Sequence, residues 1–346
     1  MENIETSKLE LRMKVAYGKL PLSSRRQNIP NLKWPRDIEV VEKTGKITLC
    51  INENAIKSNM QSNVSAFEGW LLVLKELVYK DCRFSLEFPR VEKENKHYQR
   101  FLFRLGFFDS LYGKGRHDSW FELSKTMREY LNSDCRYVNQ NILISNTGKN
   151  GRGKGKDNPT KNLSELSESE MEWRLCKDGA DKDCLKRALN TGEIYRQFPI
   201  GVFQDKVIDD NALFPGKKAC VDLVADGEKK SFWIFELKKK GNVPLGILSE
   251  LLFYTAIARD MVAGRIKTRK PSDRDCYDST NLVNKEIINA CFLAPDCHPL
   301  LLETIINQLN DAFVQLKNRD NLCSVVFHKA ILDMDNNGKL FIPEQY

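Results

Sequence analysis

The sequence predicts a mixed α/β protein, and the prediction rests on two patterns. In the second half of the chain, helical segments alternate with strands that are apolar on both faces, which is typical of a sheet covered by helices on both sides. In the first half, shorter strands and helices follow one another in a mixed α+β order. The 346 residues are 41% hydrophobic and 29% charged, which is enough apolar material for two globular domains.

The first predicted domain covers residues 1–145. Alternating hydrophobicity predicts two short strands within 37–51, with the turn at Thr44-Gly45. Ser62-Asn63 is a plausible cap for the long helix that follows. The later elements, in order, are a helix over 64–80, a strand over 82–88, and helices over 95–108 and 120–131.

A segment rich in glycine, lysine and asparagine, residues 146–163, separates the two halves. It has almost no apolar side chain to bury, so it predicts a linker. Gly148, Gly153 and Lys154 also have the spacing of a nucleotide phosphate loop. However, Gly155 stands where a Ser or Thr is required and no helical pattern follows, which favours the linker.

The second predicted domain covers residues 164–346. Its expected order is two helices, three strands, a helix, a strand, a helix and a last strand. The predicted ranges are 164–176 and 181–190 (helices), 198–203, 218–226 and 230–240 (strands), 245–264 (helix), 286–295 (strand), 298–316 (helix) and 323–330 (strand).

The strand "FWIFELKKKG" begins apolar and ends in an acid and a base two residues apart, Glu236 and Lys238. Side chains at i and i+2 of a strand share a face, so both point to the side of Ile234. A buried acid and base need partners there. Asp222 interrupts the preceding strand, "ACVDLVAD", in the same way.

The register of these two strands decides whether the acids meet. A two-residue Asp226-Gly227 turn would pair Asp222 with Ser231 and place it on the face opposite Glu236. A five-residue connection would pair Asp222 with Ile234, with Glu236 diagonally next on the same face, about 7 Å away. The predicted site requires the longer connection.

Two neighbouring carboxylates repel unless a cation lies between them. Mg²⁺ prefers such oxygen ligands, and Mn²⁺ is expected to substitute for it. A metal ion held by Asp222 and Glu236 can activate a water and polarise a phosphoryl oxygen, with Lys238 neutralising developing charge. The residue types therefore predict hydrolysis of phosphodiester bonds.

Asp222 followed by Glu236-Leu237-Lys238 resembles the motif of the PD-(D/E)xK nuclease superfamily, and the resemblance covers about 181–330. It implies a restriction-endonuclease-like mixed sheet flanked by helices. It also implies metal ligation by Asp222, Glu236 and the Leu237 carbonyl, with Lys238 as the catalytic lysine. Glu193 falls where family members often have a further acid near the end of the first core helix. Val221 replaces the proline that usually precedes the aspartate.

Other residues carry weaker indications. Glu250 and Tyr254 share a helix face and line either the cleft or the core, while Gln197 and Lys239 are minor candidates. The segment around Trp34 interleaves basic and aromatic residues that suit nucleic acid. Its arginines are Arg25, Arg26 and Arg36. On the helix over 95–108, Arg100 and Arg104 share a face that suits a nucleic-acid backbone.

The scattered cysteines and histidines predict no zinc site, and Cys297-His298 is the nearest approach to a ligand pair. Neither a signal pattern nor an apolar run of membrane-spanning length is present, so we expect a cytoplasmic protein with no membrane association. The net charge of +7 is compatible with a polyanionic partner.

These observations together predict a magnesium-dependent endodeoxyribonuclease. DNA is the expected partner, with RNA as the other substrate, and a restriction or phage-defence role fits the resemblance. Cutting both strands needs two sites, which predicts a homodimer or a larger assembly. The alternatives are a non-cleaving module that binds nucleic acid or protein, and a small-molecule enzyme that uses the 149–156 loop.

Overall fold

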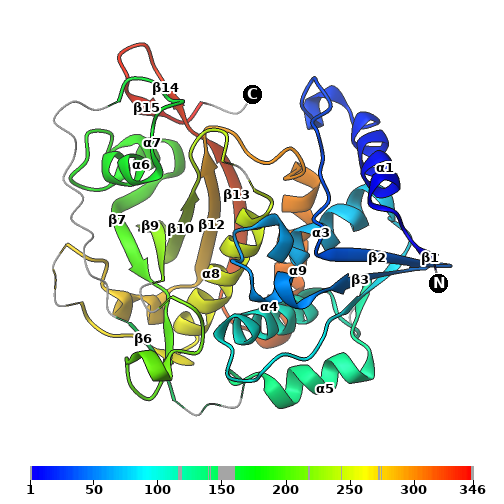
Figure 1. The fold of residues 1–346 in the computed structure, drawn as a ribbon. Coiled ribbons are helices and arrows are strands. Elements are labelled where there is room, and N and C mark those ends of the chain that lie inside the picture. The colour runs from blue at the N-terminus through cyan, green and yellow to red at the C-terminus, as the bar shows by residue number, and fades with distance from the viewer. Residues whose placement is uncertain are drawn as a thin grey trace. The chain divides into compact units, whose positions relative to one another are not determined.

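The computed structural model describes residues 2–115, 119–138, 140, 142–146, 160–216, 219–242, 244–271, 273 and 275–343. Most of the predicted linker, including the 149–156 loop, lies outside these residues. The chain forms two compact units, each with its own sheet and helices (Figure 1). Unit 1 comprises Met1–Gln140, Pro244–Ser249 and His298–Leu316, and unit 2 comprises Asn141–Val243, Glu250–Cys297 and Lys317–Tyr346. The predicted mixed α/β class is confirmed.

Unit 1 contains a five-stranded sheet in the order β1-β2-β3-β4-β5, antiparallel up to β3 and parallel from β3 to β5. The strands are β1 Glu2–Asn3, β2 Ile38–Lys43, β3 Lys46–Ile51, β4 Arg83–Glu87 and β5 Phe121–Glu122. The helices are α1 Thr6–Gly18, α2 Glu53–Lys57, α3 Phe67–Val73, α4 Lys96–Tyr112, α5 Lys125–Asp134 and most of α9 Glu303–Asp320. Shorter turns are the 3-10 helices Leu22–Ser24 and Asn63–Ser65 and the π-helix Leu74–Val78.

The sequence patterns of unit 1 account for most of these elements. The two-residue turn at Thr44-Gly45 is confirmed, with Gly45 at φ 73°, which a glycine adopts without strain. The predicted cap of α3 is wrong. Ser62 makes no capping bond, and Asn63 instead accepts a hydrogen bond from the Leu245 N–H at 2.8 Å.

Unit 2 is built on a second five-stranded sheet, here called the site sheet, in the order β13-β12-β10-β9-β7. Its strands are β7 Thr191–Pro199, β9 Cys220–Gly227, β10 Ser231–Leu237, β12 Ile287–Ala294 and β13 Ser324–Ile331. β7, β9 and β10 are antiparallel in succession, whereas β10, β12 and β13 are parallel. The remaining elements are α6 Glu168–Leu175, α7 Cys184–Leu189, α8 Gly246–Val262 from Glu250 onward, β6 Leu143–Ser145, β8 Val202–Gln204, β11 Ile266–Lys267, β14 Asp333–Met334, β15 Leu340–Phe341 and the 3-10 helices Asp209–Asn211 and Ser279–Asn284.

The two faces of the site sheet bury different side chains. Trp233, Phe235 and Leu237 of β10 form a core with Met171 and Leu185 from α6 and α7. The intervening residues of the strand, including Glu236, belong to the other face, because neighbouring side chains in a strand point to opposite sides. Figure 1 shows the five strands of the site sheet side by side. Along the chain, helices and strands of this half follow one another in the predicted order.

Two parts of the predicted organisation differ from the structure. Residues 298–316 were assigned to the second domain but belong to unit 1. There the Phe313 ring packs on Phe107 at 5.8 Å, and the Tyr112 hydroxyl donates to the Gln308 carbonyl at 3.4 Å. The strand predicted over 198–203 is also divided, because β7 begins at Thr191 and β8 joins a separate sheet with β6. Within the described residues, the helices are too short or too polar to cross a membrane.

Candidate active site

The register of the hairpin β9–β10 brings the two acids of the motif together. Phe235 pairs with Leu223, so the next pair places Asp222 opposite Glu236. Residues directly opposite in an antiparallel pair share a face and have Cβ atoms about 5 Å apart. The acids are therefore closer than the diagonal arrangement that the longer predicted connection would give.

The connection itself differs from both predicted lengths. It consists of three residues, Glu228, Lys229 and Lys230, because β9 extends to Gly227 and β10 begins at Ser231. Lys229 and Lys230 have left-handed backbones, with φ of 51° and 57°. This local geometry carries no strong sequence signal, since lysine rarely adopts it.

Asp222 is held in place by the end of the neighbouring strand. Its Oδ2 accepts a hydrogen bond from the Leu237 N–H at 2.8 Å. Burial raises the pKa of Asp222 to about 8, and Glu172 and Glu250 add to the rise, while Lys238 and the Leu237 N–H oppose it. Asp222 therefore holds its proton more tightly than an ordinary aspartate, unless a cation compensates it.

Lys238 lies between two buried carboxylates. Its Nζ forms ion pairs with Glu236 Oε1 and, at 3.3 Å, with Glu250 Oε2. The Tyr254 hydroxyl in turn donates to Glu250 Oε1 at 2.8 Å. Lys238 is 4% exposed and the two acids are 1% exposed each. Of the two α8 residues that the sequence left open between cleft and core, Glu250 contacts the motif lysine and Tyr254 contacts Glu250.

Negative charge exceeds positive charge in this cluster. Burial raises the pKa of Glu236 well above its ordinary value, and Asp222 and Glu250 raise it further. Glu236 Oε2 is buried and accepts from no N–H or hydroxyl donor among the described residues, while a hydrogen bond between the Glu236 and Glu250 carboxyl groups also raises the pKa of Glu236. One ammonium group faces three carboxyl groups, so a shared proton or a further cation must reduce the repulsion.

The charge state of Lys238 follows from the same neighbours. Burial alone would lower its pKa, but Glu236, Glu250 and Asp222 raise it, and the net result is a pKa above its ordinary value. Lys238 is therefore an ammonium at neutral pH. It can donate hydrogen bonds and stabilise negative charge, but it cannot accept a proton.

Glu172 of α6 is a functional candidate that the sequence analysis missed. Its Oε2 accepts from Gln197 Nε2 at 2.7 Å and from Arg196 Nη2 at 3.3 Å. Its partner Gln197 lies beside Asp222, and the charge of Glu172 is one of the causes that raise the pKa of Asp222. The available signal was the spacing of Glu168 and Glu172, which places two acids on one face of the predicted helix over 164–176.

Glu193 does not join the cluster. It is exposed in the first half of β7, where its carboxylate meets the Tyr195 hydroxyl at 3.4 Å. Asp222 lies beside Gln197 instead. The residues on either side of Gln197 in β7 pair with the residues on either side of Asp222 in β9. Four residues of strand separate Glu193 from Gln197, about 13 Å. Glu193 follows a helix as expected, since α7 ends at Leu189, but it lies within strand β7, which begins two residues earlier.

The remaining motif position, Leu237, and the minor candidate Lys239 lie at and just beyond the end of β10. Leu237 is the last residue of the strand and is fully buried. Lys239 is exposed, and its backbone N–H donates to Glu168 Oε1 at 3.2 Å. Asn242 Nδ2 donates to the same oxygen at 3.2 Å, so α6 anchors the loop that follows Lys238.

The basic residues proposed for nucleic acid lie in unit 1, and the structure changes their interpretation. Trp34 is buried against Trp70, with ring centroids 4.7 Å apart, so it is not available for stacking on bases. Arg25 donates to backbone carbonyls, including Leu20 O at 3.0 Å. Arg26 and Arg36 are exposed.

Arg100 and Arg104 are both buried, against the prediction that they contact a nucleic-acid backbone. Arg104 pairs with Glu68, and its Nη2 also donates to the Ser65 carbonyl at 2.6 Å. Arg100 Nη2 donates to the Ser58 carbonyl at 3.2 Å. Both guanidinium groups therefore stabilise the interior of unit 1.

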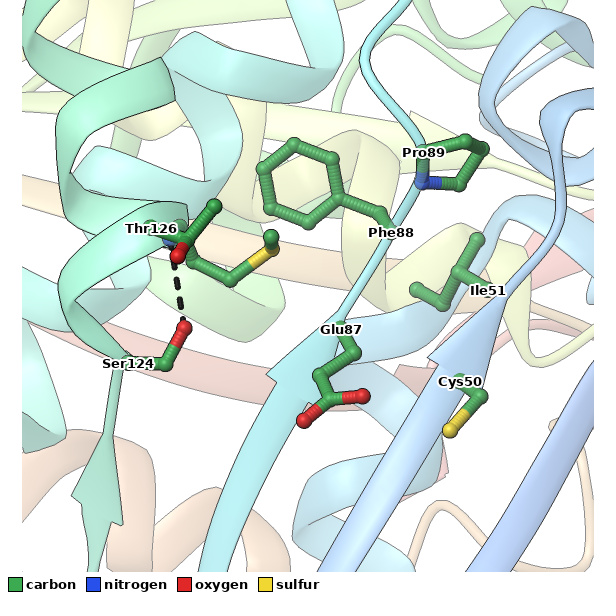
Figure 2. Close-up of a pocket in the computed structure, with 8 residues that line it drawn as sticks. Cys50, Ile51, Glu87, Phe88, Pro89, Ser124 and Thr126 are labelled. Carbon is green, nitrogen blue, oxygen red and sulfur yellow. Dashed lines mark hydrogen bonds between the residues drawn. The ribbon is translucent and has the colours of Figure 1, made fainter.

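A hollow of about 450 Å³ in unit 1 contains none of the predicted site residues (Figure 2). Figure 2 shows Glu87 and Cys50 at the ends of β4 and β3, facing Ser124 and Thr126 at the start of α5. The residues that line it include no lysine, arginine or histidine. Without a cation, the hollow does not suit a phosphate group.

The acid cluster of unit 2 has the oxygen-rich chemistry that hard divalent cations prefer. Among the described residues, no three acids, histidines or cysteines are already arranged as metal ligands, and the Lys238 ammonium lies between two of the acids. The excess of carboxyl groups and the buried oxygen of Glu236 without a donor are nevertheless the features of an oxygen site that lacks positive charge. Asp222, Glu236 and Glu172 would hold such an ion.

Comparisons of the chain with protein-family models, curated proteins and solved structures find no match. The functional argument therefore depends on the residues of this cluster and their geometry.

Proposed function

We propose that the chain is a metal-dependent nuclease of the PD-(D/E)xK type that hydrolyses DNA phosphodiester bonds. One observation carries the proposal, namely that Asp222 and Glu236 stand on adjacent strands beside Lys238 in a buried cluster with too little positive charge. Structural ion pairs do not require such an imbalance, whereas catalytic sites often retain one.

The residues of the cluster have distinct roles in this proposal. Asp222, Glu236 and Glu172 bind the divalent ion, and the Leu237 carbonyl completes the ligand set that the resemblance implies. Glu172 takes the place proposed for Glu193, because Glu172 adjoins Asp222 and Glu193 does not. A bound Mg²⁺ would polarise a phosphoryl oxygen and lower the pKa of a water molecule.

Lys238 stabilises negative charge that develops on the phosphate. Its raised pKa keeps it protonated, which suits a hydrogen-bond donor and excludes a general base. Glu250 and Tyr254 fix the position of its ammonium group through a chain of polar contacts. With a divalent ion on Glu236, Lys238 would keep Glu250 as a partner and its ammonium group would be able to turn toward the substrate.

Access to the cluster is through Asp222, which is partly exposed, as are Cys220 and Gln197 beside it. Glu236 and Lys238 are more deeply buried than Asp222. Their burial favours the alternative function, a non-cleaving module that uses the same fold for binding. The two functions can be distinguished by experiment. A nuclease requires the metal ion and Lys238 for turnover, whereas a binding module has no turnover.

The test compares Lys238→Met with the wild type and with Lys240→Met, an exposed lysine two residues further along the chain. Each protein is incubated with supercoiled plasmid, single-stranded DNA or RNA in Mg²⁺, Mn²⁺ or EDTA. We expect metal-dependent cutting of DNA by the wild type and Lys240→Met, and a loss of at least about 100-fold in Lys238→Met. Calorimetric Mn²⁺ binding should remain in all three proteins.

Three outcomes would change the proposal. Equal cutting by Lys238→Met would exclude the assigned role of this lysine. Cutting of RNA alone would replace the substrate. Nucleic-acid binding by the wild type without metal binding or cutting would identify the non-cleaving module.

A further inference from the structure

Gln197 has an unusual backbone for its position. It lies inside β7 with φ of 54°, in the left-handed region that is unfavourable for a non-glycine residue. The other described non-glycine residues with positive φ lie outside the strands, in turns or at helix ends. These are Asn190, Asp205, Lys229, Lys230 and Asn321. Strain inside a regular strand persists when the surrounding structure enforces it, and it is frequent at functional sites.

The side chain of Gln197 joins two residues that flank Asp222. Its Nε2 donates to Glu172 Oε2 at 2.7 Å, and its Oε1 accepts from the Cys220 thiol at 2.6 Å. Cys220 belongs to the same strand as Asp222, two residues earlier. The amide therefore connects helix α6 to strand β9 at the exposed edge of the acid cluster.

A neutral amide suits this position chemically. It donates to a carboxylate without adding charge, while Arg196 Nη2, at 3.3 Å, is the cationic partner of the same Glu172 oxygen. A glutamate here would add a further negative charge to a cluster that already has too many. A lysine or arginine would provide the missing positive charge and compete with a metal ion.

We propose that Gln197 is a positioning residue for the metal site. Its left-handed backbone directs the amide toward Glu172 and holds this carboxylate beside Asp222, so that both acids face the same ion. This inference rests on the proposed function, because it assigns Glu172 and Asp222 to one metal site. Gln197 itself contacts neither the ion nor the substrate.

Two substitutions separate the amide from the backbone. Gln197→Asn keeps an amide and a residue that tolerates the left-handed region, but its side chain is one methylene too short to bridge the same partners. Gln197→Gly removes the side chain and the backbone strain together. Asp205→Gly is the matched control, because Asp205 also has a left-handed backbone, φ 57°, in a turn outside the cluster.

The measurement is the dissociation constant for Mn²⁺ by calorimetry, together with urea unfolding in EDTA. We expect both Gln197 variants to bind Mn²⁺ at least about tenfold more weakly than the wild type, which is the usual effect of losing a contact that orients a metal ligand. Asp205→Gly should bind like the wild type. Gln197→Asn should remain folded in EDTA.

Unchanged Mn²⁺ affinity in both variants, with reduced stability in EDTA, would show that Gln197 is only structural and would overturn the inference while the proposed function stands. If the wild type does not bind Mn²⁺, the proposed function and the inference both fail. A tenfold loss in Asp205→Gly as well would also overturn the inference, because the effect would then be general.

Discussion

The buried Arg104–Glu68 pair of unit 1 and the buried acid cluster of unit 2 differ in their balance of charge. In unit 1, Arg104 Nε donates to Glu68 Oε1 at 2.7 Å, so one positive charge faces one negative charge. The Ser249 hydroxyl donates to Glu68 Oε2 at 2.7 Å, and Arg104 Nη2 donates to the Ser65 carbonyl at 2.6 Å. Both carboxylate oxygens of this pair therefore have donors.

The cluster of unit 2 has more acids than bases and a buried carboxylate oxygen without a donor. Its acids have raised pKa values, as expected when burial and like charges act together. The comparison indicates that the first cluster stabilises the fold, whereas the second retains unfavourable interactions that a bound cation would relieve. Four changes test this difference.

The largest expected effect of a single substitution is on the balanced cluster. Arg104→Met leaves Glu68 buried without its partner, and we expect the free energy of unfolding to fall by about 3–5 kcal/mol. Mn²⁺ affinity in unit 2 should not change in the folded protein. Urea unfolding and calorimetry measure the two quantities. The double variant Arg104→Met/Glu68→Leu should regain most of the stability, and a similar loss in both proteins would contradict the interpretation.

Removing an acid from the unbalanced cluster should have the opposite sign. Glu236→Gln reduces the repulsion and should stabilise the metal-free protein by about 1 kcal/mol, while it abolishes high-affinity Mn²⁺ binding. The control is Glu193→Gln, an exposed acid in the same sheet, which should change neither quantity. A destabilised Glu236→Gln protein that still binds Mn²⁺ would show that Glu236 is structural.

The acid cluster also predicts how stability depends on pH. Burial raises the pKa of Asp222 from 3.8 to about 8, so the folded protein keeps a proton that the unfolded chain loses above about pH 4. The metal-free protein should therefore lose stability as the pH rises from about 4 to about 8, by at most about 1.4 kcal/mol per pH unit for this group. Urea unfolding at pH 5.5 and 7.5 in EDTA measures the slope.

Asp222→Asn should flatten this dependence. Saturating Mn²⁺ should reverse it in the wild type, since the ion binds the deprotonated acid more tightly as the pH rises. An identical slope in wild type and Asp222→Asn would show that another group titrates.

The smallest effect is expected for an exposed ion pair. Lys46 Nζ lies 2.6 Å from Glu122 Oε1 at the surface of unit 1, where water screens both charges. Lys46→Ala should change the free energy of unfolding by less than about 1 kcal/mol and leave Mn²⁺ affinity unchanged. A loss comparable to that of Arg104→Met would mean that burial does not decide the strength of these pairs.

Much of the fold could be predicted because it depends on local patterns. Period-two alternation located β2, β3, β9 and β10, and apolar helical patterns located α4, α8 and α9. The start of β7 was missed because "TGEIYRQ" has little apolar alternation, and its pairing partner β9 determines where it begins. The place of α9 in unit 1 depends on ring contacts such as Phe107 with Phe313, which no local pattern contains.

The sequence by itself determined that Glu236 and Lys238 follow a buried strand and that Asp222 interrupts its neighbour, because side-chain alternation is a property of each strand alone. Only the tertiary structure decided that Asp222 stands opposite Glu236. The register depends on a three-residue loop, and two of its residues are lysines with left-handed backbones. The tertiary structure also decided that Gln197, the partner of Glu172, lies beside Asp222, whereas Glu193 lies four positions earlier in β7. Side chains from separate elements meet through packing, and the chain carries no short-range signal for such meetings.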